Sequence, residues 1–197
     1  MERTLVIIKP DAVQRGIVGE IISRFEKAGM KIIGAKFVTA SKDLLNKHYP
    51  VDREDFVVGL GKNTLNSYRE MGLKPLEQFG HQDPVKIGRT VRGWLVEFMA
   101  SGPVLALVIE GPHAIEIVRK LVGSTLPQKS APGTIRGDYS FDSSYLANTS
   151  KRSIHNLIHA SGSPKEAEFE INLWFKDKEM HNYHALHQRY MVDQAYE

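Results

Sequence analysis

The stretch that decides the fold lies in the last quarter of the chain and reads Asn156-Leu157-Ile158-His159-Ala160-Ser161-Gly162-Ser163. It begins as a short apolar strand and ends in a small polar turn, and His159 lies where the two meet. The next residues predict a helix start, because Ser163 can cap free amides, Pro164 suits the first helical position and Glu166 completes a capping box. We therefore expect a strand, a turn and a helix in succession, with a histidine at the junction.

The helix after this turn carries one apolar stripe, formed by Ala167, Ile171, Trp174 and Phe175 at helical spacing. Glu170 lies about 60° from that stripe at roughly 100° per residue, so its carboxylate is half sheltered and can reach back to the strand end. A carboxylate on one ring nitrogen of a histidine fixes the tautomer and leaves the other nitrogen as a nucleophile. Because the chain has eight histidines, geometry alone favours a plainer interpretation, an ordinary strand end before a capped amphipathic helix.

Length and composition favour a single globular domain over residues 1–197. The chain has no cysteine, which excludes a disulfide framework and a cysteine-based metal site. The N-terminus lacks the order of a signal peptide, and no apolar run approaches the roughly 18 residues of a membrane span, so we expect a cytoplasmic protein without a membrane partner. The net charge of +3 is too small to call for nucleic acid as a partner.

The order of predicted elements indicates an α+β sandwich, with helices on one face of a four-stranded antiparallel sheet. Strands are predicted at 5–8, 31–40, 104–109 and 154–160, and helices at 17–28, 44–49, 90–100, 115–122 and from 164 onward. Residues 124–153 are rich in Ser, Pro, Gly and Asp and are predicted to be mostly loop. A loop of this length is often functional.

Three blocks of the sequence resemble the nucleoside diphosphate kinase family and occur in the family's order. They are residues 3–16, which resemble the first strand and turn, 132–139, which resemble the phosphate-side loop, and 156–161 with Glu170 and 173–175, which resemble the active-site signature. The family's ferredoxin-like core has the element order predicted here. With their flanks the blocks cover most of the chain outside about 61–90 and 140–155, which we interpret as two insertions.

The resemblance implies phosphoryl exchange between nucleoside triphosphates such as ATP and nucleoside diphosphates, through a phosphohistidine. It implies that His159 is the nucleophile, that Glu170 orients the imidazole, and that Ser161 hydrogen-bonds near both. The family usually has Asp where Gly162 stands, so a carboxylate that supports the turn is missing here. The resemblance also implies Mg²⁺ on the nucleotide phosphates and a homo-oligomer built on trimers. The sequence contains no dedicated metal cage and no Walker-type phosphate loop.

Seven further residues resemble the family's nucleotide site. They are Lys9, Arg119, Thr125 and Arg136 for the phosphates, Asn156 for the ribose, Tyr49 after a short helix, and Phe56 for stacking on the base. Strand alternation places Asn156 and His159 on opposite faces, so a bend must intervene.

Taken singly, most of these positions have ordinary explanations. The arginines fit surface charges, Ser161 fits a turn serine, and Tyr49 fits a half-buried structural tyrosine. Either 55–60 or 91–95 can be the counterpart of the segment that holds the base-stacking aromatic, and Phe56 belongs to the first.

Two other functions remain open at this point. RNA- and DNA-binding modules share this strand order, and the calculated pI is about 9.0. Such modules carry clustered aromatic residues on their strands, whereas 5–9 and 154–160 carry none. The third interpretation is a kinase-like protein that has lost its activity and acts as a regulatory partner.

Overall fold

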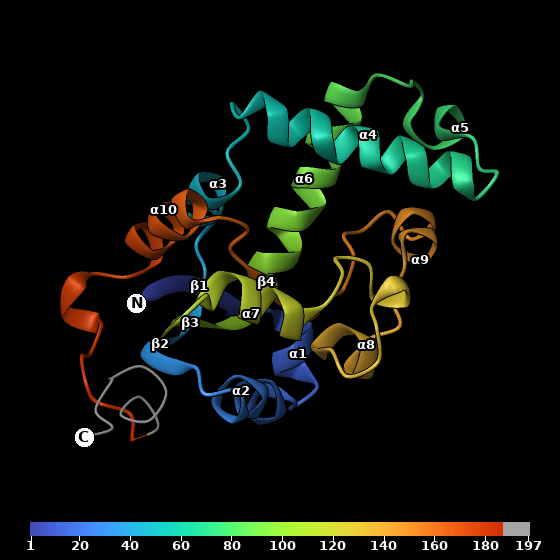
Figure 1. Cartoon of the computed structure of the whole chain (residues 1–197). Coiled ribbons are helices and arrows are strands. Elements are labelled where there is room, and N and C mark those ends of the chain that lie inside the picture. The colour runs from blue at the N-terminus through green and yellow to red at the C-terminus, as the bar shows by residue number, and fades with distance from the viewer. Residues whose placement is uncertain (187–197) are drawn as a thin grey trace.

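A four-stranded antiparallel sheet lies at the centre of the molecule (Figure 1), in a computed structural model that describes residues 1–186. The strands are β1 (Glu2–Ile8), β2 (Lys31–Thr39), β3 (Pro103–Gly111) and β4 (Ile158–Ala160), in the order β2-β3-β1-β4. Each neighbouring pair is antiparallel, and β4 pairs with the end of β1 through Ile7 and His159. The predicted four-stranded antiparallel sheet is confirmed.

Helices surround the sheet and fill the connections between its strands. They are α1 (Pro10–Gln14), α2 (Val18–Lys27), α3 (Lys42–His48), α4 (Glu54–Glu70), α5 (Pro75–Phe79), α6 (Pro84–Ala100), α7 (Ala114–Val122), α8 (Ile135–Tyr139), α9 (Ser144–Thr149) and α10 (Pro164–Trp174), with short 3-10 turns at Pro127–Lys129 and Asp177–Glu179. Within residues 1–186, no helix has the length and apolar character needed to cross a bilayer.

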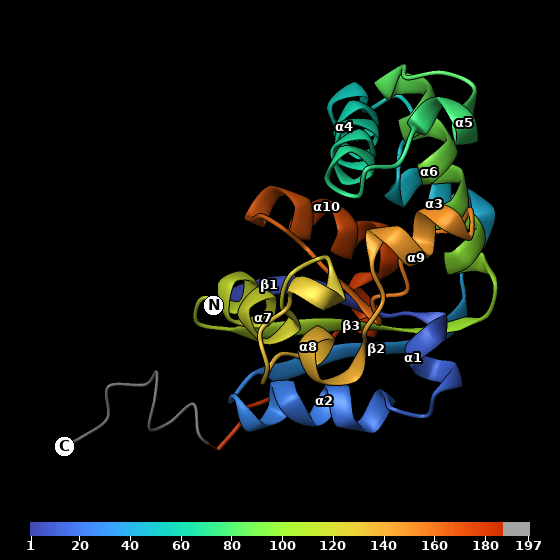
Figure 2. The ribbon, with the colours of Figure 1, turned by 90° about the vertical axis from the view of Figure 1, so that its right-hand side faces the viewer.

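Both faces of the sheet are buried, which corrects the expectation of helices on one face (Figure 2). Leu5 and Ile7 of β1 pack into a core with α3, α6 and α10, while Val6 and Ile8 pack into a second core with α2 and α7. Successive residues of a strand point to opposite faces, so a continuous apolar run is the pattern of a strand covered on both sides. No sheet face is left within residues 1–186 for the base stacking that RNA-recognition domains use.

The first predicted insertion belongs to a helical hairpin that stands away from the sheet, at the top of Figure 1. Its two long helices, α4 and α6, cross closely because glycine lies at both contact points. A Cβ atom at Gly61 would lie 1.8 Å from the carbonyl oxygen of Pro84, and one at Gly88 would lie 1.9 Å from that of Val57. The second helix starts at Pro84 rather than at residue 90, because Asp83 caps it by accepting from the amide of Val85 at 2.8 Å.

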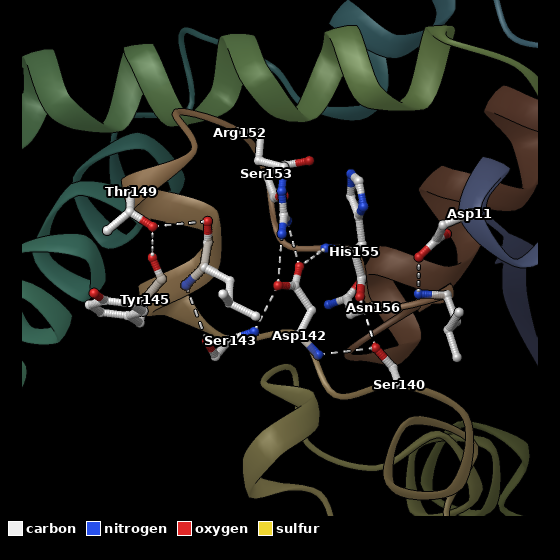
Figure 3. A network of polar contacts seen from close by, with 12 residues as sticks. Asp11, Ser140, Asp142, Ser143, Tyr145, Thr149, Arg152, Ser153, His155 and Asn156 are labelled. Atoms are coloured by element: carbon white, nitrogen blue, oxygen red, sulfur yellow. Dashed lines mark hydrogen bonds and ion pairs between the residues drawn. The ribbon is translucent and has the colours of Figure 1, made fainter.

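The segment 124–153, predicted to be mostly loop, contains three short helical elements, the 3-10 turn Pro127–Lys129, α8 and α9, and most of its residues lie outside them. Its second half is closed by Asp142, as Figure 3 shows. The carboxylate of Asp142 accepts from both terminal nitrogens of Arg152, at 2.6 and 2.9 Å, and from the amide of His155 at 2.6 Å. Ser140 donates to the carbonyl of His155 at 3.0 Å. These bonds return the chain to the sheet at a defined point.

The predicted strand 154–160 is shortened to three residues by a tight turn at Leu157. The amide of Ile158 donates to the carbonyl of Asn156 at 2.8 Å, and Leu157 has a φ of 67°, the left-handed region. This is a γ-turn, which is strained for a branched residue. Two bonds hold it, from the amide of Leu157 to Asp11 at 3.0 Å and from the amide of Lys9 to the carbonyl of Leu157 at 2.8 Å. The turn is the bend that the site requires between Asn156 and His159.

Candidate active site

The side chains of His159, Glu170 and Ser161 form one chain of hydrogen bonds between β4 and α10. Nε2 of His159 lies 2.9 and 3.0 Å from the two carboxylate oxygens of Glu170, and the Ser161 hydroxyl donates to Oε2 of Glu170 at 2.6 Å. Ser161 is fully buried, and its hydroxyl also accepts from the amide of Leu5. The ring nitrogen of His159 that remains without a partner among the described residues is therefore Nδ1.

Glu170 is ionised in this arrangement although it is only 3% exposed. Burial works to raise its pKa, but the field of His159 and the hydrogen bonds from His159 and Ser161 outweigh burial and lower the pKa below its usual value. A carboxylate that accepts from Nε2 places the proton of a neutral imidazole on that nitrogen and leaves a lone pair on Nδ1.

A second histidine, His48 at the end of α3, lies behind this chain and was not anticipated from the sequence. Its ring lies 4.7 Å from that of His159, and its Nδ1 accepts from the indole nitrogen of Trp174 at 3.2 Å. Burial first, and then the field of His159, lowers the pKa of His48 to about 3, so the ring is neutral. Its proton must lie on Nε2, which has no hydrogen-bond partner in residues 1–186 and is 3.7 Å from Oε1 of Glu170.

His48, His159 and Glu170 present ligand atoms within 4.8 Å of one another, a spacing that a metal ion can use. The hydrogen bonds argue against that use. Nε2 of His48 carries a proton because Trp174 donates to Nδ1, and Nε2 of His159 is bound to the carboxylate. Both nitrogens that face Glu170 are therefore occupied by hydrogen.

Lys9, the residue directly after β1, is a buried lysine with no carboxylate partner among the described residues. Its ammonium donates to Oδ1 of Asn156 at 2.7 Å, and Lys9 is only 5% exposed. Burial, and then the nearby Arg136, lowers the pKa of Lys9 to about 7. Burial thus makes the charged ammonium unfavourable. An anion bound beside Lys9 would offset this, because an opposite charge favours the ammonium form.

Arg136, on α8, is tied to backbone carbonyls on two segments of the chain. Its guanidinium donates to the carbonyls of Asn156 at 3.0 Å, Ile158 at 2.6 Å, and Gly123 and Ser124 both at 3.1 Å. Four of its five N–H groups are engaged in this way, so one remains for a ligand. Burial, and then the field of Arg119, lowers the pKa of Arg136 to about 10.

Asn156 joins Lys9 to the loop after α7. Its amide nitrogen donates to the carbonyl of Thr125 at 2.9 Å, and its amide oxygen accepts from Lys9. Arg119, on the last turn of α7, is exposed, and its guanidinium forms no hydrogen bond or ion pair with any residue from 1 to 186. It is the predicted nucleotide-site arginine whose donors are all open to a ligand in the described part of the chain.

A cavity of about 860 Å³ opens in front of His159 and brings these groups together. One side, which we call the inner wall, consists of Lys9, Tyr49, Arg119, Thr125, Arg136, Asn156 and His159. The opposite side, the outer wall, consists of Asn63, Thr64, Ser67 and Glu70 of α4 with Ala147 and Asn148 of α9. The predicted insertions thus contribute to the cavity that contains the histidine.

Two kinds of predicted site residue lie outside the cavity lining. Glu170 and Ser161 are buried behind His159 and position it. The ring of Phe56 stacks on that of Tyr49 with the centroids 6.1 Å apart, the guanidinium of Arg53 lies 5.3 Å from the Phe56 centroid, and Phe56 is not part of the lining. Its stacking on a base stays a prediction.

Comparison with known proteins decides the family. The family model described as nucleoside diphosphate kinase matches residues 2–63 and 85–180, most of the chain. The chain belongs to the nucleoside diphosphate kinase family. The match leaves out 64–84, which lies inside the first predicted insertion and contains α5. The second predicted insertion, 140–155, lies within the matched range.

Curated nucleoside diphosphate kinases match nearly the whole chain. The protein of Pyrobaculum aerophilum is 51% identical over 180 residues, covering 91% of this chain and 98% of its own. The protein of Borreliella burgdorferi is 39% identical over 185 residues, covering 93% of this chain and 92% of its own.

Solved structures of nucleoside diphosphate kinases share the fold. The crystal structure from Pyrobaculum aerophilum superimposes with a TM-score of 0.89 at 50% identity, covering 92% of this chain and 99% of that one. A transition-state mimic of the Borrelia burgdorferi enzyme with bound vanadate and ADP gives 0.77 at 36% identity, covering 96% and 95%. The Halobacterium salinarum enzyme in complex with CDP gives 0.67 at 35% identity, covering 96% and 97%.

Proposed function

We propose that this nucleoside diphosphate kinase transfers the γ-phosphate of a nucleoside triphosphate to a nucleoside diphosphate through a phosphohistidine on Nδ1 of His159. The observation that carries the residue assignment is the bond between Nε2 of His159 and Glu170 at 2.9 Å, since it leaves Nδ1 as the available nucleophile. The family membership supports the reaction, and the cavity beside His159 has the cationic side chains that a polyphosphate requires.

In the first half-reaction, the Nδ1 lone pair attacks the γ-phosphorus, and the bond from that phosphorus to the β–γ bridging oxygen breaks. The nucleoside diphosphate leaves with the electron pair. In the second, a terminal oxygen of another nucleoside diphosphate attacks the phosphorus, and the N–P bond breaks. Positive charge develops on the imidazole during attack, and the carboxylate of Glu170, held by Ser161, stabilises it.

The inner wall supplies the charge stabilisation on which such transfers depend. Arg119 offers all its donors, Arg136 offers one, and Lys9 offers an ammonium that burial makes costly without an anion. The amide of Asn156 and the hydroxyls of Thr125 and Tyr49 line the same wall and suit the sugar and the remaining phosphate oxygens.

Mg²⁺ is the cofactor that we propose, carried on the phosphates. The lining fits it, because Glu70 and Glu166 bring carboxylate oxygens, the ligand type that Mg²⁺ prefers, to the cavity. When bound, the ion would neutralise part of the phosphate charge, and Lys9, Arg119 and Arg136 would neutralise the rest.

Incubation with γ-labelled ATP tests the function. The protein should acquire an acid-labile, base-stable label, and addition of GDP should discharge the label as GTP. His159→Ala should abolish labelling while its thermal melting temperature stays close to that of wild type. A label that persists in this variant removes His159 from the mechanism. Absence of label and turnover in wild type favours an inactive regulatory partner.

The predicted homo-oligomer built on trimers has support in the segment before β4. Phe141 is 84% exposed and Tyr145 is 51% exposed, apolar area that a subunit contact would bury. Sedimentation of wild type should give a multiple of three subunits, and Phe141→Ser should shift the distribution to smaller species. A cytoplasmic location stays a prediction.

A further inference from the structure

The carboxylate of Glu166 lies at an unusual place at the start of α10. In a capping box the third helical residue accepts from the amide of the cap residue, here Ser163. Glu166 instead reaches one residue further, and its Oε2 accepts from the amide of Gly162 at 2.8 Å. Ser163 caps the helix separately by accepting from the amide of Glu166 at 3.2 Å. The helix cap therefore does not depend on this carboxylate alone.

The absence of a side chain at Gly162 leaves space for the carboxylate of Glu166 where it lies. A Cβ atom there would lie 2.7 Å from Oε2 of Glu166 and 3.5 Å from Nη1 of Arg119. The carboxylate thus occupies the point from which a side chain at 162 would begin, beside the arginine that keeps its donors open. A residue from the next helical turn supplies negative charge where residue 162 has no side chain.

Glu166 faces the same cavity as the inner wall. It lines the cavity with His159 and Gly162, and its charge adds to the effects that raise the pKa of Tyr49, after burial and Glu170. Its second oxygen, Oε1, accepts from no residue between 1 and 186. A carboxylate in this place repels phosphate oxygens unless a divalent cation lies between them.

We propose that Glu166 makes the site selective for the magnesium complex of its nucleotides over the metal-free forms, through a carboxylate that lies beside the side-chain-free Gly162. Arg119 attracts the phosphates in either form, whereas Glu166 penalises only the form without the cation. This inference rests on the proposed function, because it assumes that the cavity receives the polyphosphate.

Calorimetric titration of ADP with Mg²⁺ and of ADP with chelator tests the proposal without relying on turnover. Wild type should bind the magnesium complex more tightly, and Glu166→Gln should reduce that ratio by about tenfold, mainly by improving the affinity for metal-free ADP. Glutamine keeps an acceptor for the amide of Gly162, so the turn is retained. Glu168→Gln, an exposed position on the same helix, is the matched control and should keep the wild-type ratio.

The exchange variant Gly162→Asp with Glu166→Ala should restore the wild-type ratio, because it returns a carboxylate to the same point from residue 162. The proposal is overturned if Glu166→Gln keeps the wild-type ratio of affinities for magnesium-bound and metal-free ADP. It is also overturned if the exchange variant has a wild-type melting temperature but does not recover that ratio. Labelling of wild type by γ-labelled ATP distinguishes failure of this inference from failure of the proposed function. A labelled protein with an unchanged ratio refutes this inference alone, and an unlabelled protein refutes the proposed function.

Discussion

The two walls of the cavity are held in different ways. On the inner wall, Arg136 donates to four backbone carbonyls and Asn156 bonds to both Lys9 and a backbone carbonyl. On the outer wall, α4 and α9 are joined mainly through Gln78, which accepts from the hydroxyl of Tyr68 and donates to the carbonyl of Asn148. An exposed ion pair between Lys129 and Glu70, at 3.5 Å, links α4 to the loop before α8.

The difference suggests that the reaction requires fixed positions for the inner-wall side chains but not for those of the outer wall. Side chains that contact the reacting phosphorus must be positioned precisely, and hydrogen bonds from neighbouring groups provide that precision. The outer wall belongs partly to residues that the family model does not match, so this part of the chain departs from the family model. We expect substitutions on the inner wall to change the rate or folding strongly, and those on the outer wall to leave the rate of phosphohistidine formation nearly unchanged.

The largest effect should follow from Glu170→Gln. An amide neither holds the Nε2 proton by charge nor stabilises the imidazolium, so phosphohistidine formation should slow by about a thousandfold. Ser161→Ala is the graded control, because it removes one bond to Glu170 but keeps the carboxylate, and it should slow the step far less. Rapid-quench measurement of labelled protein gives both rates. A Glu170→Gln rate equal to wild type would show that the inner wall does not depend on this carboxylate.

The two arginines provide the next contrast. Arg136→Lys loses most of the bonds to carbonyls, so the free energy of unfolding should fall by about 3 kcal/mol. Arg119→Lys, at an exposed position with no partner in the described chain, should leave that free energy within about 0.5 kcal/mol of wild type and raise the KM for nucleotide instead. Urea unfolding and steady-state kinetics measure the two effects. Equal stability of the two variants would remove the structural role of Arg136.

Glycine at the crossing of α4 and α6 tests the outer wall. Gly88→Ala places a methyl group 1.9 Å from the carbonyl of Val57, which should lower the free energy of unfolding by about 2 kcal/mol through overpacking. Gly59→Ala lies in the same hairpin with no atom within 4 Å and should be neutral or slightly stabilising. Labelling of His159 should proceed at nearly the wild-type rate in both. A large loss of labelling in Gly88→Ala would mean that the position of His159 depends on the packing of α4 against α6.

The depressed pKa of Lys9 gives a pH dependence to nucleotide binding. Bound phosphate favours the ammonium and raises the pKa above about 7, so binding above that pH takes up a proton, whereas below it the lysine is already charged. Affinity for ADP should therefore be level below pH 7 and fall by up to about tenfold per pH unit above it. Calorimetry at pH 8.5 in two buffers of different ionisation enthalpy measures the uptake. Lys9→Met should lose it, and uptake that survives in this variant belongs to another group.

The smallest effect is expected at the ion pair of the outer wall. Lys129→Ala should change the free energy of unfolding by less than about 0.5 kcal/mol, since both partners are largely exposed. Thermal melting at low and high salt measures it. A loss well beyond this value would mean that the outer wall is held more firmly than its contacts indicate.

Local patterns in the sequence predicted much of the fold and part of the site. The apolar run of β1, the cap at Ser163 and the helical phase of Glu170 each depend on neighbours within one or two turns. His48 could not be found in this way, because its hydrogen-bond partner Trp174 lies 126 positions later in the chain. The bonds of Arg136 likewise join segments that only the folded chain brings together. Asp83 and Pro84 are a helix-start signal, so the sequence does contain the early start of α6. The prediction began at residue 90 because it followed the apolar stripe of residues 90–100.

The closure made by Asp142 has a consequence for how this part of the gene can change. Because Arg152 and the amide of His155 are fastened to one carboxylate, the polypeptide between positions 143 and 151 begins and ends at nearly the same spot. We expect residues added in that interval, outside the cavity-lining Ala147 and Asn148, to leave His159 in place, which makes it a candidate point for grafting a foreign peptide.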